Sequence, residues 1–184
     1  FERLYQRIVR ILDDEANKYL APHATMLDVA CGTGEIIFRL AKKYPAVNFT
    51  GIDLTPAMVT AAQDKAKALP NITVKAGNAS NLPFIDQTFN VILCSEAFHH
   101  FSNPEQALRE MNRVAMHHSL FLLVDPGAAS KIVTKAMQTI ARTFEVNKQL
   151  YNQDELRKLL AGNGFRVRSQ SHHFFNNFFV CEKN

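Results

Sequence analysis

Two glycines and one aspartate form the clearest chemical pattern in the 184-residue sequence. Gly32 and Gly34 follow a strand pattern with the apolar residues Met26, Leu27 and Val29, and a helical pattern of apolar residues begins directly after them. Glycine permits positive φ angles and close approach of a ligand, and a helix N-terminus offers free N–H groups. Asp53, about twenty residues further on, ends a second apolar run, where a carboxylate can bind ribose hydroxyls. The pattern predicts a nucleoside site.

The spacing also bears on the kind of nucleotide. The dinucleotide fingerprint requires a third glycine three residues after the second, and Ile37 occupies that position. This argues against a bound pyrophosphate, so an NAD-type oxidoreductase is the weakest alternative. A Gly-x-Gly pair is also common in plain strand–helix turns, and the glycines alone do not decide between a ligand site and such a turn.

Four blocks of the chain resemble those of the class I S-adenosylmethionine (SAM)-dependent methyltransferases, in the same order. LDVACGTGE (27–35) is similar to motif I, GIDLTPAM (51–58) to motif II, and GNASNLPF (77–84) and FNVILCSEAFHHF (89–101) to two later blocks. The likeness is strongest to small-molecule enzymes of the quinone-biosynthesis C-methyltransferase type. It implies SAM as cofactor, S-adenosylhomocysteine (SAH) as product, and a cofactor site of Asp28, Ala30, Gly32, Gly34, Asp53, Leu54, Met58, Asn78, Ala79 and Ser95.

The sequence departs from the family pattern at three places. Asn78 stands where an aspartate usually accepts a bond from the adenine amino group, Asn90 replaces another aspartate, and 116–119 replaces a Pro-Gly-Gly turn. These departures keep open an alternative, a catalytically silent SAM- or SAH-binding module or partner subunit. Met58 fits equally well as a core residue or as a flank of the adenine.

Glu96, His99 and His100 are the candidate catalytic residues. They follow the apolar run Phe89–Ser95, at the carboxyl end where ligands bind in open α/β sheets. A histidine can act as a base near neutral pH, but a base is needed only if the acceptor must lose a proton. A structural histidine pair is equally compatible with the sequence. No third ligand lies at suitable spacing, so we expect no metal site.

The resemblance implies direct displacement at the sulfonium methyl carbon, with the protein aligning the acceptor, the methyl group and the sulfur. No N-P-P-Y or D-P-P-Y block follows the fourth strand, which argues against methylation of an amide or adenine nitrogen. We therefore expect a small-molecule acceptor. The pattern does not say whether oxygen, nitrogen, sulfur or carbon is methylated.

Alternating strand and helix patterns predict one α/β domain over residues 1–184. We expect a Rossmann-like, doubly wound, mostly parallel sheet with helices on both faces. The resemblance implies seven strands with the last one antiparallel, and the sequence places the final pair at 165–168 and 174–181.

Two helices are expected to cover the ligand. The first, within 1–22, is a candidate lid in which Tyr5 and Arg10 could reach the ligand. The second, within 128–150, is a short roof over the acceptor site whose inward residues are Ile132, Val133, Ala136, Met137 and Ile140. Because the roof is short, a homodimer that completes the pocket is an open alternative.

The composition of the chain bears on which kinds of partner it can bind. The net charge of +4 and the pI of about 9.0 come from scattered lysines and arginines, which favours solvated helix faces over a nucleic-acid surface. We expect no membrane span and no signal peptide. Three separate cysteines form neither a metal motif nor a disulfide framework, and this favours a reducing, cytoplasmic location.

Overall fold

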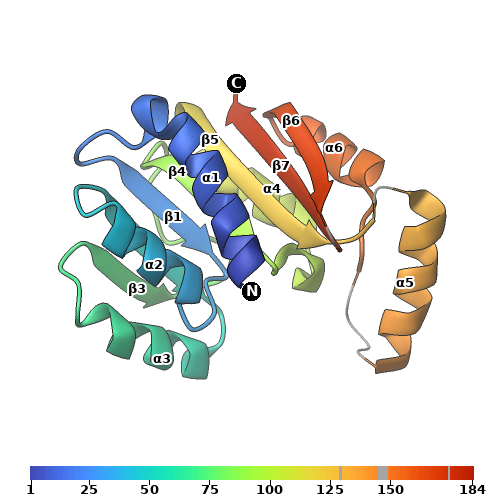
Figure 1. The fold of residues 1–184 in the computed structure, drawn as a ribbon, viewed down its shortest axis with the longest axis horizontal. Helices are drawn as coiled ribbons and strands as arrows, with labels where there is room; N and C mark the ends of the chain where they lie inside the picture. Colours follow the sequence, from blue (N-terminus) through green and yellow to red (C-terminus); the bar gives the residue numbers. More distant parts are fainter. Residues whose placement is uncertain (129, 145–148, 174) are drawn as a thin grey trace.

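A computed structural model describes residues 1–128, 130–144, 149–173 and 175–184. Helices and strands alternate along most of the chain (Figure 1). The elements are α1 (Glu2–Tyr19), β1 (Thr25–Val29), α2 (Glu35–Lys43), β2 (Asn48–Asp53), α3 (Pro56–Ala66), β3 (Ile72–Ala76), β4 (Phe89–Ser95), the 3₁₀ helix η1 (Phe98–His100), α4 (Pro104–Val114), β5 (Ala115–Pro126), α5 (Lys131–Phe144), α6 (Gln153–Gly162), β6 (Phe165–His173) and β7 (Asn176–Lys183).

The strands form a seven-stranded sheet in the order β3-β2-β1-β4-β5-β7-β6. The pairs among β1 to β5 are parallel, whereas β7 runs antiparallel to both β5 and β6. The predicted doubly wound, Rossmann-like sheet with a reversed last strand is therefore confirmed. The strand order reverses between β1 and β4, and ligands bind at such a point beyond the carboxyl ends of the strands.

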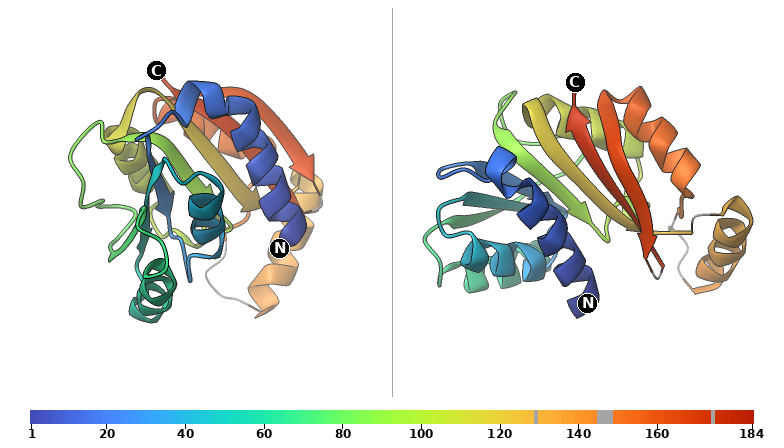
Figure 2. Two further views of the ribbon diagram at one scale, coloured as in Figure 1. Left: turned by 60° about the vertical axis from the view of Figure 1, so that its left-hand side comes forward. Right: turned by 45° about the horizontal axis from the view of Figure 1, so that its top comes forward.

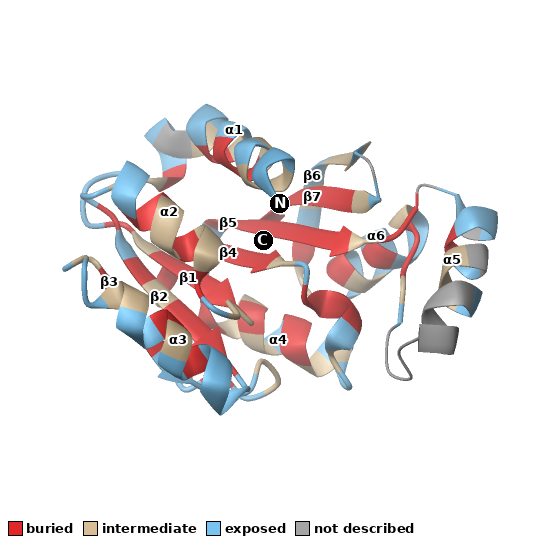
Figure 3. Cartoon of the chain, turned by 60° about the horizontal axis from the view of Figure 1, so that its bottom comes forward, coloured by how far each residue is buried: buried red, intermediate tan, exposed pale blue. Residues whose placement is uncertain are grey.

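Two hydrophobic clusters cover the two faces of the sheet. Successive strand residues point to opposite faces, so Met26 joins the cluster under α1, α2 and α3, while Leu27 joins the one under α4 and α6. Figure 2 shows α1 lying across one face, and Figure 3 shows that buried residues concentrate on the strands and on the inner sides of the helices. Because central strands are covered on both faces, they read as nearly continuous apolar runs.

The structure corrects two boundaries and the orientation of one helix. Residues 116–119, expected as a link, belong to β5, and the register against β4 shifts where β5 begins. Helix α5 begins at Lys131 rather than Ala128, and the end expected near Lys148 lies outside the described residues.

The expected inward face of α5 is wrong at two positions. Ile132 is 82% exposed and Val133 is 50% exposed, whereas the side chains of Ala136 and Ile140 lie outside the described part of the chain. Figure 1 shows that α5 stands apart from the sheet and from the helices that cover its two faces. None of the helices in the described ranges is long and apolar enough to cross a membrane.

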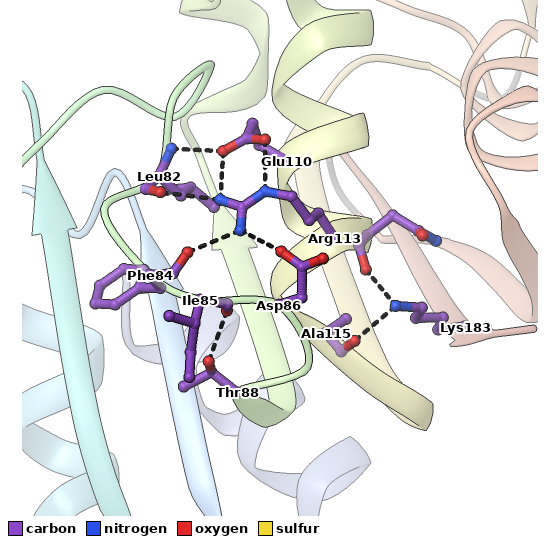
Figure 4. A network of polar contacts seen from close by, with 10 residues as sticks. Leu82, Phe84, Ile85, Asp86, Thr88, Glu110, Arg113, Ala115 and Lys183 are labelled. Atoms are coloured by element: carbon purple, nitrogen blue, oxygen red, sulfur yellow. Dashed lines mark hydrogen bonds and ion pairs between the residues drawn. The ribbon is translucent and has the colours of Figure 1, made fainter.

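A network around Arg113 fixes the loop between β3 and β4 against α4 (Figure 4). The Arg113 guanidinium donates to the carbonyl oxygens of Leu82 and Phe84 at 3.0 and 2.7 Å and pairs with Glu110 and Asp86. Glu110 in turn accepts from the backbone N–H of Leu82 at 2.8 Å. The network holds the loop that continues from residues 78–80.

Candidate functional site

The turn between β1 and α2 is built from left-handed backbone conformations. Gly32 and Gly34 have φ angles of 56° and 76°, and Ala30 has a φ of 58°. Apart from its chain neighbours, a Cβ on Gly32 would meet no atom of the described residues within 4 Å, whereas one on Gly34 would lie 3.3 Å from the Ala62 Cβ. Gly32 therefore leaves open space beside the turn, and Gly34 lets α2 pack closely against α3.

Asp53 ties the end of β2 to this turn. Its Oδ2 accepts a hydrogen bond from the backbone N–H of Gly32 at 2.8 Å, and its Oδ1 accepts one from the N–H of Thr55 at 2.9 Å. Each oxygen of an ionised carboxylate has two acceptor positions, so each retains one for a ligand hydroxyl. Asp53 is thus positioned by the backbone and still able to bind.

A cavity of about 520 Å³ opens beside Asp53, and we call it the first cavity. Leu54 and Met58 form an apolar wall and are 67% and 41% exposed, so Met58 is not a core residue. The candidates that line this cavity are Ala30, Gly32, Asp53, Leu54, Met58, Asn78, Ala79, Glu96 and His100. The volume lies within the usual range of small-molecule sites.

A second cavity of about 470 Å³ adjoins the first and shares Ala30, Gly32 and Glu96 with it. Asp28 and Ser95 are the other predicted residues in its lining. Burial, with a smaller contribution from the Asp53 charge, raises the pKa of Asp28 to about 8. The Ser95 Oγ is buried, and among the described residues it has no hydrogen-bond partner. A cation in the second cavity would favour the ionised form of Asp28.

Glu96 lies at the junction of the two cavities with a φ of 57°, a strained conformation for a residue other than glycine. Desolvation of its carboxyl group, and the nearby Asp125 charge, raise its pKa. His100 lines the first cavity, as the predicted catalytic role requires.

His99 points elsewhere. It is only 4% exposed, and its Nδ1 lies 2.9 Å from Oδ1 of the buried Asp125. Neither His99 nor Gly34 belongs to the lining of the two joined cavities. The structure thus brings Glu96 and His100 together at the cavities and places His99 behind them.

Asn78 and Asn90, which stand where the family pattern has aspartate, have different surroundings in the structure. The Asn78 Oδ1 accepts a bond from the backbone N–H of Ser80 at 2.8 Å, so part of its acceptor capacity orders its own loop. The Asn90 Oδ1 accepts from the backbone N–H of Thr25 at 2.9 Å, at the start of β1. Asn90 is therefore a structural link between strands and does not line the joined cavities.

Several lining residues carried no local signal in the sequence. Phe1 and Leu4 of the α1 end and Asn176 of β7 line the second cavity, although they are far apart in the chain. Tyr5 and Arg10, the two residues expected to reach the ligand from the lid, do not line the joined cavities. The Tyr5 ring centroid lies 5.1 Å from the Arg39 guanidinium carbon, and Arg10 is exposed. The α1 N-terminus therefore covers the site through Phe1 and Leu4.

No group of three or more histidine, cysteine, aspartate or glutamate side chains suited to a metal ion occurs in the part of the chain that the structure describes. Cys31 lines the second cavity, but burial and the charges of Asp28 and Asp53 raise the pKa of its thiol far above its usual range. A neutral thiol is a poor nucleophile, so this cysteine offers little chemistry of its own.

Comparisons with known proteins agree with this geometry. The norajmaline N-methyltransferase of Rauvolfia serpentina is 34% identical over 142 residues, which cover 76% of this chain and 44% of that protein. The ubiquinone/menaquinone biosynthesis C-methyltransferase UbiE of Roseobacter denitrificans is 31% identical over 145 residues, covering 76% and 57%. The chain thus spans about half the length of these curated relatives.

Among solved structures, the YcgJ protein of Bacillus subtilis superposes with a TM-score of 0.75 at 27% sequence identity, covering 87% of this chain and 70% of that one. Residues 20–164 match a family model described as a methyltransferase domain. This segment contains the glycine turn, Asp53, Glu96 and His100. Because the match covers most of the sequence, the chain belongs to the methyltransferase domain family.

Proposed function

We propose that the chain binds SAM across the two joined cavities and transfers its sulfonium methyl group to a small molecule. The observation that carries this proposal is the Asp53 carboxylate, which is held by the glycine turn and faces a cavity of suitable size for a nucleoside. Family membership supports the cofactor. The names of the relatives, which refer to norajmaline and to quinone biosynthesis, support the small-molecule class.

The first cavity is the proposed adenosine site. The two acceptor positions that remain on Asp53 suit the two ribose hydroxyls, and Leu54 and Met58 provide apolar surface for the adenine. Asn78 and Ala79 line the same cavity. Because the Asn78 carbonyl already accepts from Ser80, its contribution to the adenine is weaker than that of a free carboxylate.

The second cavity is the proposed site of the methionine portion. An ammonium group there would favour the ionised form of Asp28, and Ser95 lines the same cavity. Gly32 and Ala30 line both cavities, so the backbone of the turn runs beside the junction. Gly34 contributes by setting the approach of α2 to α3 rather than by touching the ligand.

When bound, SAM supplies a methyl group already activated by the positive sulfur, and SAH remains after transfer. The residues of this chain then have to align the acceptor and exclude water. Glu96 lies at the junction, and its raised pKa makes its carboxylate a better proton acceptor than an ordinary glutamate. His100 is the second candidate base, and His99 supports the segment from its buried position.

Calorimetric titration with SAM and with SAH tests the proposal directly. We expect both to bind, and we expect NAD to show no measurable binding. Absence of binding by both SAM and SAH would overturn the proposal. Binding without transfer of a labelled methyl group to any member of a metabolite panel would instead support the alternative of a catalytically silent binding module.

A further inference from the structure

A third cavity of about 330 Å³ lies between α1 and the ends of β6 and β7. It shares Phe1, Leu4 and Asn176 with the second cavity and no residue with the first. The three cavities therefore follow one another from the adenosine site outward. The third cavity is lined by Phe1, Arg3, Leu4, Arg7, His173, Asn176 and Phe178.

The charged residues that line the second and third cavities are of opposite sign. The second cavity is lined by Asp28, Glu35 and Glu96, all of which are acidic. The third cavity has Arg3 and Arg7, one turn apart on α1, and no aspartate or glutamate among its described lining residues. If bound cofactor and acceptor together carry a cation and an anion, the cation would therefore prefer the second cavity and the anion the third.

Arg7 has unused hydrogen-bonding capacity. Its Nη2 lies 3.4 Å from the Ser171 hydroxyl, a long contact. Its Nε is buried, and no hydrogen-bond acceptor contacts it in the described part of the structure. A buried donor without a partner is costly, and the planar guanidinium suits two parallel bonds to a carboxylate. A carboxylate in the third cavity would accept from the Nη groups of this guanidinium, whose contact to Ser171 is long.

We propose that the third cavity binds a carboxylate carried by the methyl acceptor, next to an apolar part that contacts Phe1, Leu4 and Phe178. This inference rests on the proposed function, because it assigns the first two cavities to SAM. The acceptor's nucleophilic atom would then lie near Glu96, at the junction of the first two cavities, while its carboxylate pairs with Arg7. The site thus selects an amphipathic acid rather than a neutral or cationic acceptor.

The test uses protein saturated with SAH and two probes of the same shape, 3-phenylpropanoate and 3-phenylpropanamide. We expect the carboxylate to bind at least about tenfold more tightly than the amide, measured by NMR chemical-shift titration, in line with a charge-assisted pair. Arg7→Met keeps the aliphatic stem and should abolish this preference, and Arg7→Lys should retain part of it. Arg10→Met is the matched control, because Arg10 is exposed on the same helix.

Equal binding of the two probes, or an unchanged preference in Arg7→Met, would overturn the inference. A second measurement separates the acceptor from the cofactor as the source of the carboxylate. If Arg7→Met weakens SAH but not 5′-methylthioadenosine, which lacks the amino-acid group, Arg7 binds the cofactor and the inference is wrong. Failure of the wild type to bind either SAM or SAH would instead overturn the proposed function itself.

Discussion

The Asp53 carboxylate and the Gly32 backbone N–H are joined by a 2.8 Å hydrogen bond that links the carboxyl end of β2 to the turn after β1. Thr55 provides a second N–H at 2.9 Å. The side chain that is proposed to bind ribose therefore also fixes the two segments around it. In the proposed function, ligand binding and local structure depend on the same carboxylate.

Asp53→Ala is expected to lower the affinity for SAH by about tenfold to a hundredfold, because it removes charge-assisted bonds worth about 1.5–3 kcal/mol. The affinity for 5′-methylthioadenosine should fall equally, since both ligands contain the ribose. Calorimetric titration measures both. Asp64→Ala removes an exposed carboxylate that pairs with Lys67, and it should leave both affinities unchanged. Unchanged SAH binding by Asp53→Ala would contradict the assigned ribose site.

Gly32→Ala separates stability from binding. The positive φ of Gly32 should cost a Cβ-bearing residue about 1–2 kcal/mol of unfolding free energy, and no protein atom would clash with the new methyl group. The added methyl stands in the open space beside both cavities, so we expect a larger loss in SAH affinity than in stability. Gly162→Ala, also without a neighbour within 4 Å, is the control for an unobstructed glycine. If SAH affinity is unchanged, the ligand does not approach the turn.

Much of the site follows from local patterns in the sequence. The apolar runs before Gly32 and before Asp53 identify parallel strands, and parallel strands place their carboxyl ends at one edge of the sheet. This reasoning places the glycine turn, Asp53 and Glu96 at the same edge of the sheet without any knowledge of distant contacts. The sheet order followed from the family resemblance rather than from composition.

Other features depend on contacts that no local pattern reports. His99 and His100 are neighbours, and only the turn of η1 decides that His100 meets the cavity while His99 meets Asp125. Phe1 and Asn176 reach the same cavity from opposite ends of the chain. The amphipathic pattern of α5 predicts an inward face, but the helix stands apart from the sheet and Ile132 is exposed.

The raised pKa of Asp28 predicts a pH dependence of stability. The folded pKa is about 8, above the ordinary value of 3.8, so the folded protein retains a proton that the unfolded chain releases. This contribution to stability is fully present below about pH 4 and is lost as the pH rises toward 8. Asp28→Asn should reduce the fall in unfolding free energy between pH 5 and pH 8, as measured by chemical denaturation without ligand. An identical fall in both proteins would contradict it.

The same carboxyl group predicts proton release when SAH binds. An ammonium group beside Asp28 favours the ionised form, so affinity should increase with pH until about pH 8. Titration at pH 7 in phosphate and in Tris should yield different apparent enthalpies, because the buffers take up the released proton with different heats. Asp28→Asn should bind more weakly and show no such difference. Buffer-independent enthalpies in the wild type would place the ammonium elsewhere.

Arg113→Met is expected to destabilise the protein by about 1–3 kcal/mol, because the carbonyl groups of Leu82 and Phe84 lose their donor. The loosened loop continues into the wall of the first cavity, so SAH affinity should also fall by a few fold. Arg109→Met on the same helix removes exposed contacts to Gln106 and Glu105 and is the matched control. Equal unfolding free energies for the two variants would show that the network does not stabilise the loop.

His99→Ala and His100→Ala should separate the supporting residue from the lining residue. His99→Ala leaves the buried Asp125 without its ring partner at 2.9 Å, so we expect a loss of about 1–3 kcal/mol in unfolding free energy. Burial raises the pKa of Asp125, and His99 partly offsets this rise. Removal of His99 should therefore raise the pKa of Asp125 further, and the stability loss should be larger at higher pH.

His100→Ala, at an exposed position, should have an unfolding free energy within about 0.5 kcal/mol of the wild type. It should instead alter SAH affinity. Chemical denaturation at pH 5 and pH 8 measures the stability of both variants, and calorimetric titration measures their affinity for SAH. Equal losses of unfolding free energy in His99→Ala and His100→Ala would show that the His99–Asp125 contact does not stabilise the fold.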